Sequence, residues 1–175
     1  LIAEEQVTVF SQTPSAYRRV LHDARFHASV AASRLRYLVL SGEAIRRDDI
    51  AGWLARGHRA RLINTYAITE TAGQLALRVY GEGDATEESA RNLGQPLAGR
   101  EVLVVDAAGQ PVEAGTAGEL WVGGECVTPG YVSAPELSAR FSELAVHGAG
   151  VLRGYLTGDR MRRLADGSLE YLGRV

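Results

Sequence analysis

A nearly continuous apolar run from Leu35 to Leu40 is the feature that most limits how this chain can fold. A strand with one face in water alternates apolar and polar residues, whereas a strand covered on both faces of a parallel sheet is apolar along its length. A turn at Ser41 to Ala44 follows the run, and a helical pattern that ends near Gly57 leads to another short strand, Arg61 to Ile63. This order of strand, helix and strand predicts a parallel sheet.

The residues before this run fit the same architecture. Val7 to Phe10 is rich in residues that favour strands. Thr13 and Pro14 predict a helix start, because threonine caps a helix amino end and proline suits the first helical position. Apolar residues then recur at helical spacing: Tyr17, Val20, Leu21 and Ala24. We expect residues 1–75 to form the C-terminal part of a flavodoxin-like α/β lobe.

From about Leu75 onward, short alternating runs with turn residues between them replace this pattern. Glu101 to Val105 and Gly118 to Val122 are predicted strands, and Ala165 to Gly167 is predicted to be the turn of a hairpin. Four acidic residues are predicted to lie in a solvated loop between the lobes: Glu82, Asp84, Glu87 and Glu88. We expect residues 76–175 to form a mostly antiparallel, β-barrel-like lobe.

Composition narrows the functional classes. The chain has 175 residues, 46% of them hydrophobic, and a net charge of −2, so it can bury a core but has no basic stripe for nucleic acid. It contains no apolar run near the ~18 residues of a membrane span and no secretion signal pattern. Cys126 is the only cysteine, which suits a reducing cytoplasm. Metal-ligand spacing is absent among the histidines: His22, His27, His58 and His147.

The segment Asn64 to Thr71 carries the chemistry of a nucleotide and metal site. An asparagine amide can pair with a purine edge, and a tyrosine ring can stack on a purine face. A threonine hydroxyl can donate to a phosphate oxygen, and a glutamate can hold magnesium. This segment and the turn Ser41 to Ala44 both follow predicted strands, where open α/β sheets bind ligands.

The segment resembles the motif N-x-Y-G-x-T-E of adenylate-forming enzymes, and most closely that of the amino-acid-activating domains of nonribosomal peptide synthetases. Further stretches resemble that family in the right order. Gly118 to Gly124 followed by Pro129 to Tyr131 resembles its G-E-L-x-x-x-G … R-G-Y motif. Tyr155 to Asp159 matches Y-x-T-G-D, Gly173-Arg174 matches the start of its hinge motif, and Gln12 to Ser15 is similar to the peptide-synthetase branch.

The resemblance has departures. Ala67 stands where the family has glycine, so this position needs a negative φ to avoid strain. Cys126 and Pro129 replace a glycine and an arginine, and Leu156 stands where a basic residue is common. None of these changes removes a functional group expected to contact a ligand.

The resemblance implies roles for individual residues. Tyr66 is expected to stack on adenine, with Asn64 and the turn Gly42, Glu43 and Ala44 at its edges. Thr69 and Glu70 are the expected catalytic residues, at the α-phosphate and at magnesium respectively. Asp159, on a solvent-facing turn, is expected to bind the ribose hydroxyls, and Arg174 the ribose or phosphate. The expected acid pocket consists of Ser11, Val39, Ser41, Thr65, Gly73 and Gln74.

The function implied is an adenylation domain that joins a carboxylic acid, expected to be an amino acid, to AMP from ATP and Mg²⁺ with release of pyrophosphate. The acyl group would then pass to the phosphopantetheine thiol of a carrier domain. All 19 basic residues are arginine, so the catalytic lysine of that family is absent. Because the chain also opens with Leu1, we expect a fragment that is inactive alone and lacks the phosphate-loop and C-terminal segments.

Two alternatives stay open. One is a fragment of an acyl- or aryl-CoA ligase of the same superfamily, against which the peptide-synthetase-like Gln12 to Ser15 argues. The other is a non-catalytic interaction module from an interrupted adenylation domain. A phosphate loop upstream, with a lysine-bearing domain and a carrier-protein serine downstream, would separate these interpretations. The identity of the acid is not determined by the residues present.

Overall fold

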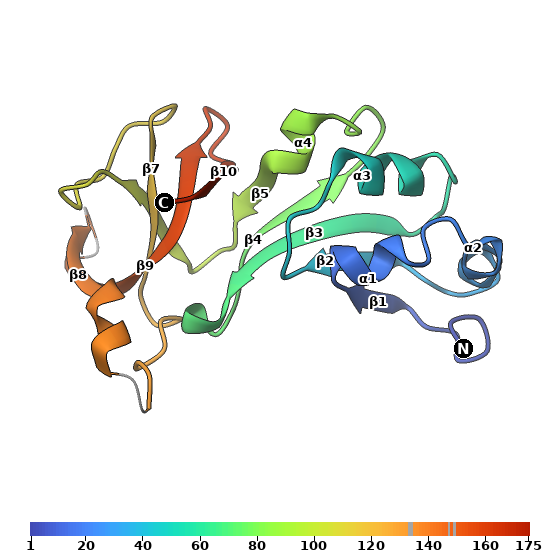
Figure 1. Cartoon of the computed structure of the whole chain (residues 1–175), viewed down its shortest axis with the longest axis horizontal. Coiled ribbons are helices and arrows are strands. Elements are labelled where there is room, and N and C mark those ends of the chain that lie inside the picture. The colour runs from blue at the N-terminus through green and yellow to red at the C-terminus, as the bar shows by residue number, and fades with distance from the viewer. Residues whose placement is uncertain (133–134, 147, 149) are drawn as a thin grey trace. The chain divides into compact units, whose positions relative to one another are not determined.

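The computed structural model describes residues 1–132, 135–146, 148 and 150–175, and for 135–137 it describes the backbone alone. The chain divides into two compact units (Figure 1). Unit 1 comprises Leu1–Tyr66 and Leu77–Leu93, and unit 2 comprises Ala67–Ala76 and Gly94–Val175. This division differs from the expected boundary at residue 75, because the chain passes between the units inside strands.

Unit 1 is an α/β unit with a parallel sheet. Its elements in chain order are β1 (Val9–Gln12), α1 (Pro14–Arg18), α2 (Ala24–Ala31), β2 (Tyr37–Ser41), α3 (Arg47–Leu54), the first part of β3 (Arg61–Ile68), the last part of β4 (Gly73–Tyr80), α4 (Glu87–Arg91) and the start of β5 (Asn92–Pro96). Strand β2 pairs in parallel with β1 on one side and with β3 on the other. The predicted parallel α/β fold is therefore confirmed.

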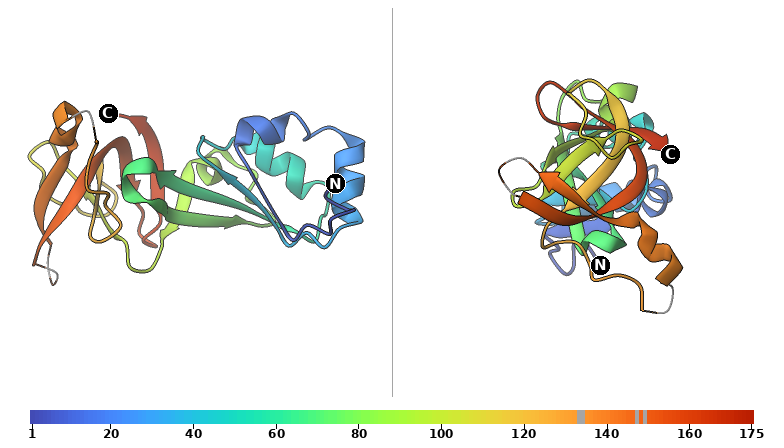
Figure 2. Two further views of the ribbon diagram at one scale, coloured as in Figure 1. Left: turned by 90° about the horizontal axis from the view of Figure 1, so that it is seen from below. Right: turned by 90° about the vertical axis from the view of Figure 1, so that its left-hand side faces the viewer.

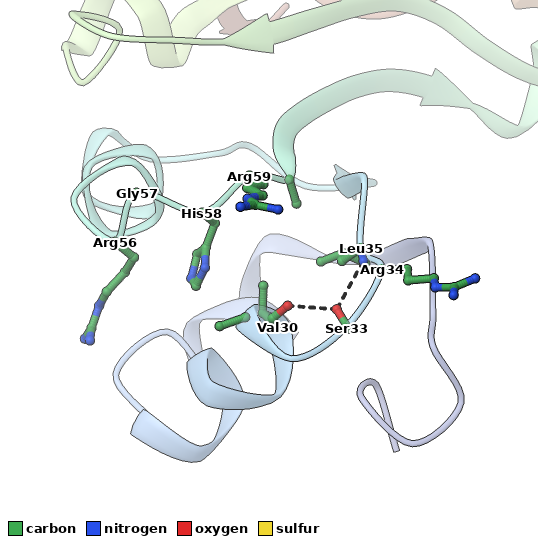
Figure 3. A pocket seen from close by; sticks show the side chains of 10 residues that line it. Val30, Ser33, Arg34, Leu35, Arg56, Gly57, His58 and Arg59 are labelled. Atoms are coloured by element: carbon green, nitrogen blue, oxygen red, sulfur yellow. Dashed lines mark hydrogen bonds between the residues drawn. The ribbon is translucent and has the colours of Figure 1, made fainter.

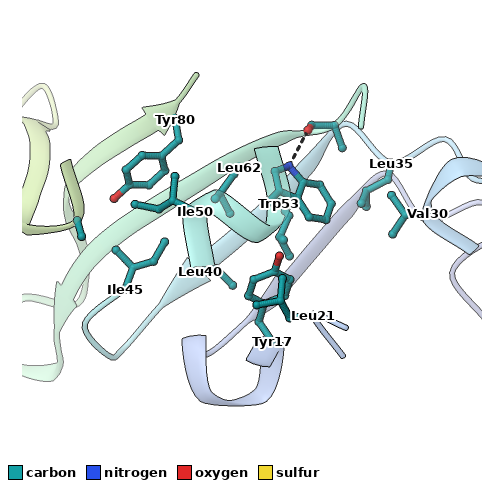
Figure 4. Packing of buried hydrophobic residues seen from close by; sticks show 13 residues of the cluster. Tyr17, Leu21, Val30, Leu35, Leu40, Ile45, Ile50, Trp53, Leu62 and Tyr80 are labelled. Atoms are coloured by element: carbon teal, nitrogen blue, oxygen red, sulfur yellow. Dashed lines mark hydrogen bonds between the residues drawn. The ribbon is translucent and has the colours of Figure 1, made fainter. Parts of the chain in front are cut away.

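The core of unit 1 lies between its helices and one face of this sheet (Figure 4). Leu38, Leu40 and Leu62 are fully buried on that face, whereas the intervening Val39 and Ile63 are outside the core cluster, as strand alternation requires. Trp53 of α3 contributes the largest buried side chain, and its indole N–H donates to the carbonyl of Ala60 at 3.1 Å. The sheet is thus covered by helices on one face.

Several predicted boundaries in unit 1 are wrong. Strand β3 continues to Ile68, so the segment from Asn64 lies within the strand and not after it. The helix predicted from Pro14 stops at Arg18, and a new helix starts after Asp23, whose carboxylate accepts a hydrogen bond from the N–H of Arg25. The local cause is this second cap, which competes with helical continuation.

The acidic stretch is only partly the predicted loop. Asp84 accepts hydrogen bonds from the Arg78 guanidinium at 2.6 Å and from the N–H of Gly81 at 2.8 Å. Thr86 caps α4, which begins at Glu87, so two of the four acidic residues lie in the first turn of a helix. Negative charge there is favoured by the partial positive charge of the helix amino end.

Unit 2 is mostly antiparallel. It contains the end of β3, η1 (Thr69–Thr71), the start of β4, the end of β5, β6 (Glu101–Val105), β7 (Ala117–Gly123), η2 (Pro135–Arg140), β8 (Phe141–Val146), β9 (Gly150–Arg163) and β10 (Leu169–Arg174). The strands β8 to β10 can be followed from orange to red in Figure 2. Strand β9 pairs with β7, β8 and β10, and β6 pairs with β7.

The predicted antiparallel lobe is confirmed, but its described strands form an open path and not a closed barrel. The hairpin between β9 and β10 turns where predicted, with Gly167 at a φ of 86°, a value that favours glycine. Strand β6 also has the predicted bounds. The hairpin places Asp159 of the Y-x-T-G-D motif in register with Arg174 of the hinge motif.

Candidate functional site

Four of the expected acid-pocket residues share one face of the parallel sheet in unit 1. Ser11 is in register with Val39, and Ser41 is in register with Thr65, where its hydroxyl donates to the Thr65 carbonyl at 3.2 Å. This face is opposite to the helix-covered core, because Leu38 and Leu40 point to the other side. The sheet therefore brings together small and polar groups near the carboxyl ends of β1 and β2 and within β3.

Asn64 lies on the other face of β3, in register with the core residue Leu40. Tyr66, two residues further along the strand, shares that face. The residues expected at adenine and those expected at the acid are thus separated by strand alternation. A strand can in this way present two ligand portions with distinct surroundings.

Two buried polar atoms in the middle of β3 have no partner within the described part of the chain: Asn64 Oδ1 and Thr65 Oγ1. Asn64 is 3% exposed and Thr65 is 6% exposed. Buried polar groups in folded proteins are nearly always paired, so each of these two atoms, which lie on opposite faces of β3, indicates a place that a ligand or water completes.

The turn after β2 is held to the start of α1. Gly42 has a φ of 84°, which favours glycine at this position. The Glu43 carboxylate accepts from the N–H of Ser15 at 3.0 Å and from its hydroxyl at 2.6 Å. The Ser15 hydroxyl, with smaller effects from its N–H and Arg18, lowers the pKa of Glu43. Because this carboxylate is engaged, the turn offers a ligand the backbone groups of Gly42 to Ala44.

The second half of the motif belongs to unit 2. Ala67 lies within β3 and has no positive φ, so the methyl group in place of glycine causes no backbone strain. Thr69 begins η1 and is exposed, while Glu70 is half-buried in the same turn. Gly73 and Gln74 begin β4 and belong to unit 2, whereas the other four expected pocket residues belong to unit 1.

Glu70 is bound by two tyrosines that sequence reasoning did not assign. The Tyr131 hydroxyl donates a short hydrogen bond to Glu70 Oε1, and the Tyr155 hydroxyl donates to the same oxygen at 3.3 Å. The Glu70 carboxylate, and then the Tyr155 hydroxyl, raise the pKa of Tyr131, so this phenol stays a donor. The sequence does contain a signal for both tyrosines, because Tyr131 ends one family-like motif and Tyr155 begins the next.

Asp159 and Arg174 are brought together on β9 and β10. The Arg174 guanidinium donates to Asp159 Oδ1 at 2.8 Å and to the Thr157 carbonyl at 3.1 Å. Asp159 is 5% exposed and lies within β9, so its expected position on a solvent-facing turn is wrong. The reason is that β9 continues through the whole Y-x-T-G-D segment, so no turn forms there. The N–H of Gly158 donates a hydrogen bond to Glu119 Oε1 at 2.7 Å.

A pocket of about 640 Å³ opens elsewhere in unit 1 (Figure 3). Its lining includes Leu35, two residues before β2, and Ala60, directly before β3, together with Arg34, His58 and Arg59. None of the residues expected in the site lines it. This pocket therefore lies at the amino ends of β2 and β3, whereas the expected acid-pocket residue Ser41 lies at the carboxyl end of β2.

The part of the chain that the structure describes contains neither a cluster of metal-ligand side chains nor a membrane-spanning helix. Within it, no group of three or more His, Cys, Asp or Glu side chains is arranged to hold a metal ion. His147 lies outside the described residues. Over the same residues, no helix has the length and apolar character needed to cross a membrane.

Comparison with solved structures supports this fold. PA1221, described as an NRPS protein containing adenylation and PCP domains, matches with a TM-score of 0.85 and 30% identity over 99% of this chain and 34% of that chain. The N-terminal subdomain of Klebsiella oxytoca NpsA in complex with 3-hydroxybenzoyl-AMSN has a TM-score of 0.83, and at 22% identity it supports the fold alone. It is covered over 43% of its length.

Sequence relatives point the same way. Syringomycin synthase SyrB1 of Pseudomonas syringae pv. syringae is 37% identical over 99% of this chain, and a dimodular nonribosomal peptide synthase of Bacillus subtilis (strain 168) is 36% identical over 100%. The chain spans only 28% and 8% of the lengths of these relatives. Residues 1–132 match the family described as AMP-binding enzyme. The chain therefore belongs to the family of AMP-binding enzymes.

Proposed function

We propose that this chain forms the nucleotide- and acid-binding part of a nonribosomal peptide synthetase adenylation domain, an ATP-dependent adenylate-forming ligase. The domain joins a carboxylic acid, on our proposal an amino acid, to AMP and releases pyrophosphate. The observation that carries this proposal is the pair of buried atoms left unpaired by the described residues, Asn64 Oδ1 and Thr65 Oγ1, inside the adenylation motif. The names of the two sequence relatives, a syringomycin synthase and a nonribosomal peptide synthase, support the same reaction.

Each residue role in the site is part of this proposal. Tyr66 stacks on adenine, while Asn64 and the backbone of Gly42, Glu43 and Ala44 meet its polar edges. Thr69, exposed at the start of η1, donates to the α-phosphate. Asp159 accepts from the ribose hydroxyls, which suits an ionised group with two oxygens, and Arg174 holds it in place and contacts ribose or phosphate.

The residues present fit a magnesium ion that arrives with the nucleotide. Glu70 offers a hard carboxylate oxygen, Oε2, that accepts no hydrogen bond from the described residues, while no cage of three protein ligands exists in that part of the chain. Magnesium is usually held by one or two carboxylates and by substrate phosphates. When bound, the ion neutralises phosphate charge, and Glu70 supplies the protein ligand.

The acid binds on the sheet face of Ser11, Val39, Ser41 and Thr65, with Gly73 and Gln74 as further pocket residues. The acyl group then passes to the phosphopantetheine thiol of a peptidyl carrier domain, a proposal supported by the occurrence of both domains in PA1221. The phosphate-loop and lysine-bearing segments of the same domain are the other partners. We also propose a cytoplasmic setting, where the lone buried thiol of Cys126 stays reduced.

Acid-dependent pyrophosphate exchange tests the proposal. The 175-residue chain alone should show no exchange above a Glu70→Ala control, because it contains no lysine to stabilise the charge that develops at the α-phosphate. Joined to the phosphate-loop and lysine-bearing segments, it should exchange with one or a few amino acids. Thioester formation on free coenzyme A would instead identify a CoA ligase, and continued silence would favour a non-catalytic module.

A further inference from the structure

Two phenol hydroxyls converge on one oxygen of Glu70. Tyr131 and Tyr155 both donate to Oε1, and their hydroxyl oxygens are 3.2 Å apart. All three residues belong to unit 2, and the tyrosines are separated from Glu70 by 61 and 85 positions along the chain. Local turn geometry therefore does not explain the contact.

The surroundings of the two tyrosines hold them in place. The ring of Phe141 lies edge-on to Tyr131 with centroids 5.9 Å apart, and its centroid is 4.8 Å from that of Tyr155. The guanidinium of Arg153 lies 4.5 Å from the Phe141 centroid and donates to the carbonyls of Thr128 and Pro129. The segment that carries Tyr131 is thus tied to β9, the strand that carries Tyr155.

The backbone of Glu70 is tied to the same segment. Its carbonyl accepts from the N–H of Thr128 at 2.8 Å. Oε1 already accepts two hydrogen bonds, while Oε2 accepts none from the described residues. Both the backbone and one carboxylate oxygen are therefore fixed, and the second oxygen points in a defined direction.

We propose that Tyr131 and Tyr155 are positioning residues that orient Glu70 so that Oε2 meets the divalent cation of a bound metal–nucleotide. The inference rests on the proposed function, in which Glu70 is the magnesium ligand. Groups that hydrogen-bond a ligating side chain fix its orientation, and their loss usually weakens metal binding about ten- to a hundredfold. Oxygen Oε1 holds the carboxylate, and Oε2 is the ligand.

Calorimetric titration of the complete adenylation domain separates this role from a merely structural one. ATP is titrated once with Mg²⁺ and once with a chelator and no metal. Tyr131→Phe and Tyr155→Phe should weaken Mg²⁺·ATP binding about tenfold and leave metal-free ATP binding unchanged. Tyr37→Phe is the matched control, because among the described residues its hydroxyl has a single, long hydrogen bond, which it accepts from Arg36 at 3.5 Å. In a Glu70→Gln background, Tyr131→Phe should add no further loss.

Each of the other possible results contradicts either the positioning inference alone or the magnesium assignment as well. If Glu70→Gln weakens Mg²⁺·ATP binding but both tyrosine variants behave like Tyr37→Phe, the positioning inference is wrong and the proposed function stands. If Glu70→Gln itself leaves Mg²⁺·ATP binding unchanged, the magnesium assignment and the inference fail together. If the tyrosine variants lose affinity for Mg²⁺·ATP and for metal-free ATP equally, these residues only support the fold.

Discussion

The expected site residues of unit 1 and those of unit 2 differ in how their polar atoms are satisfied. In unit 1, Asn64 and Thr65 keep buried polar atoms to which the described residues offer no partner. In unit 2, Glu70 and Asp159 accept hydrogen bonds from other side chains: the tyrosine pair and Arg174. Since an unpaired buried group costs free energy and a paired one does not, unit 1 should gain more from a ligand, while unit 2 is arranged in advance.

The largest effect on stability should follow from breaking the paired arrangement of unit 2. Thr157 is 4% exposed, and its hydroxyl donates to the Leu120 carbonyl at 3.0 Å and accepts from the Asp159 N–H at 3.1 Å. Thr157→Val removes both of these buried hydrogen bonds and should lower the free energy of unfolding by about 2–4 kcal/mol. Urea unfolding of the chain measures this. A change below about 0.5 kcal/mol would mean that water replaces the hydroxyl.

The ribose assignment of Asp159 gives the next effect in size. Asp159→Asn keeps the volume but removes the charge, and one hydrogen bond to a charged acceptor contributes about 1.5–3 kcal/mol, so the affinity of the adenylation domain for ATP should fall about tenfold. Its affinity for adenine without ribose should barely change. Calorimetry with both ligands measures the difference.

Glu170→Gln is the control for that comparison. Glu170 is 6% exposed and is paired with an arginine, Arg162, on the neighbouring strand, but it lies outside the expected site. Glu170→Gln also removes the charge from the ion pair between Glu170 and Arg162. It therefore shows how far a general weakening of the β9–β10 pairing affects ATP binding. If both variants lower the affinity for ATP equally, or if Asp159→Asn lowers the affinity for adenine as much as that for ATP, the Asp159 carboxylate is structural.

Local chemistry made much of the fold predictable. Thr13 caps α1 and Gly167 turns the last hairpin, because each signal acts within a few residues. The extension of β3 to Ile68 was not predicted, because the segment from Asn64 includes polar residues expected to bind a ligand and its strand pairing depends on neighbouring strands. In the candidate site, the tyrosine contacts to Glu70 join positions 61 and 85 residues apart, which a motif-by-motif reading of one sequence does not connect.

The smallest effect should have the opposite sign and lies in unit 1. Thr65 is 6% exposed on β3, and its Oγ1 atom has no partner among the described residues. Valine has nearly the same shape, favours strands and carries no hydroxyl to leave unpaired, so Thr65→Val should raise the free energy of unfolding by about 0.5–1 kcal/mol. The same variant should bind the acid more weakly, because the hydroxyl is then missing from the pocket. Urea unfolding and acid titration measure the two effects, and Thr157→Val is the matched substitution with the reverse sign. A loss of stability in Thr65→Val would show that the hydroxyl is already satisfied, and the contrast between the two units would then fail at the residue that defines it.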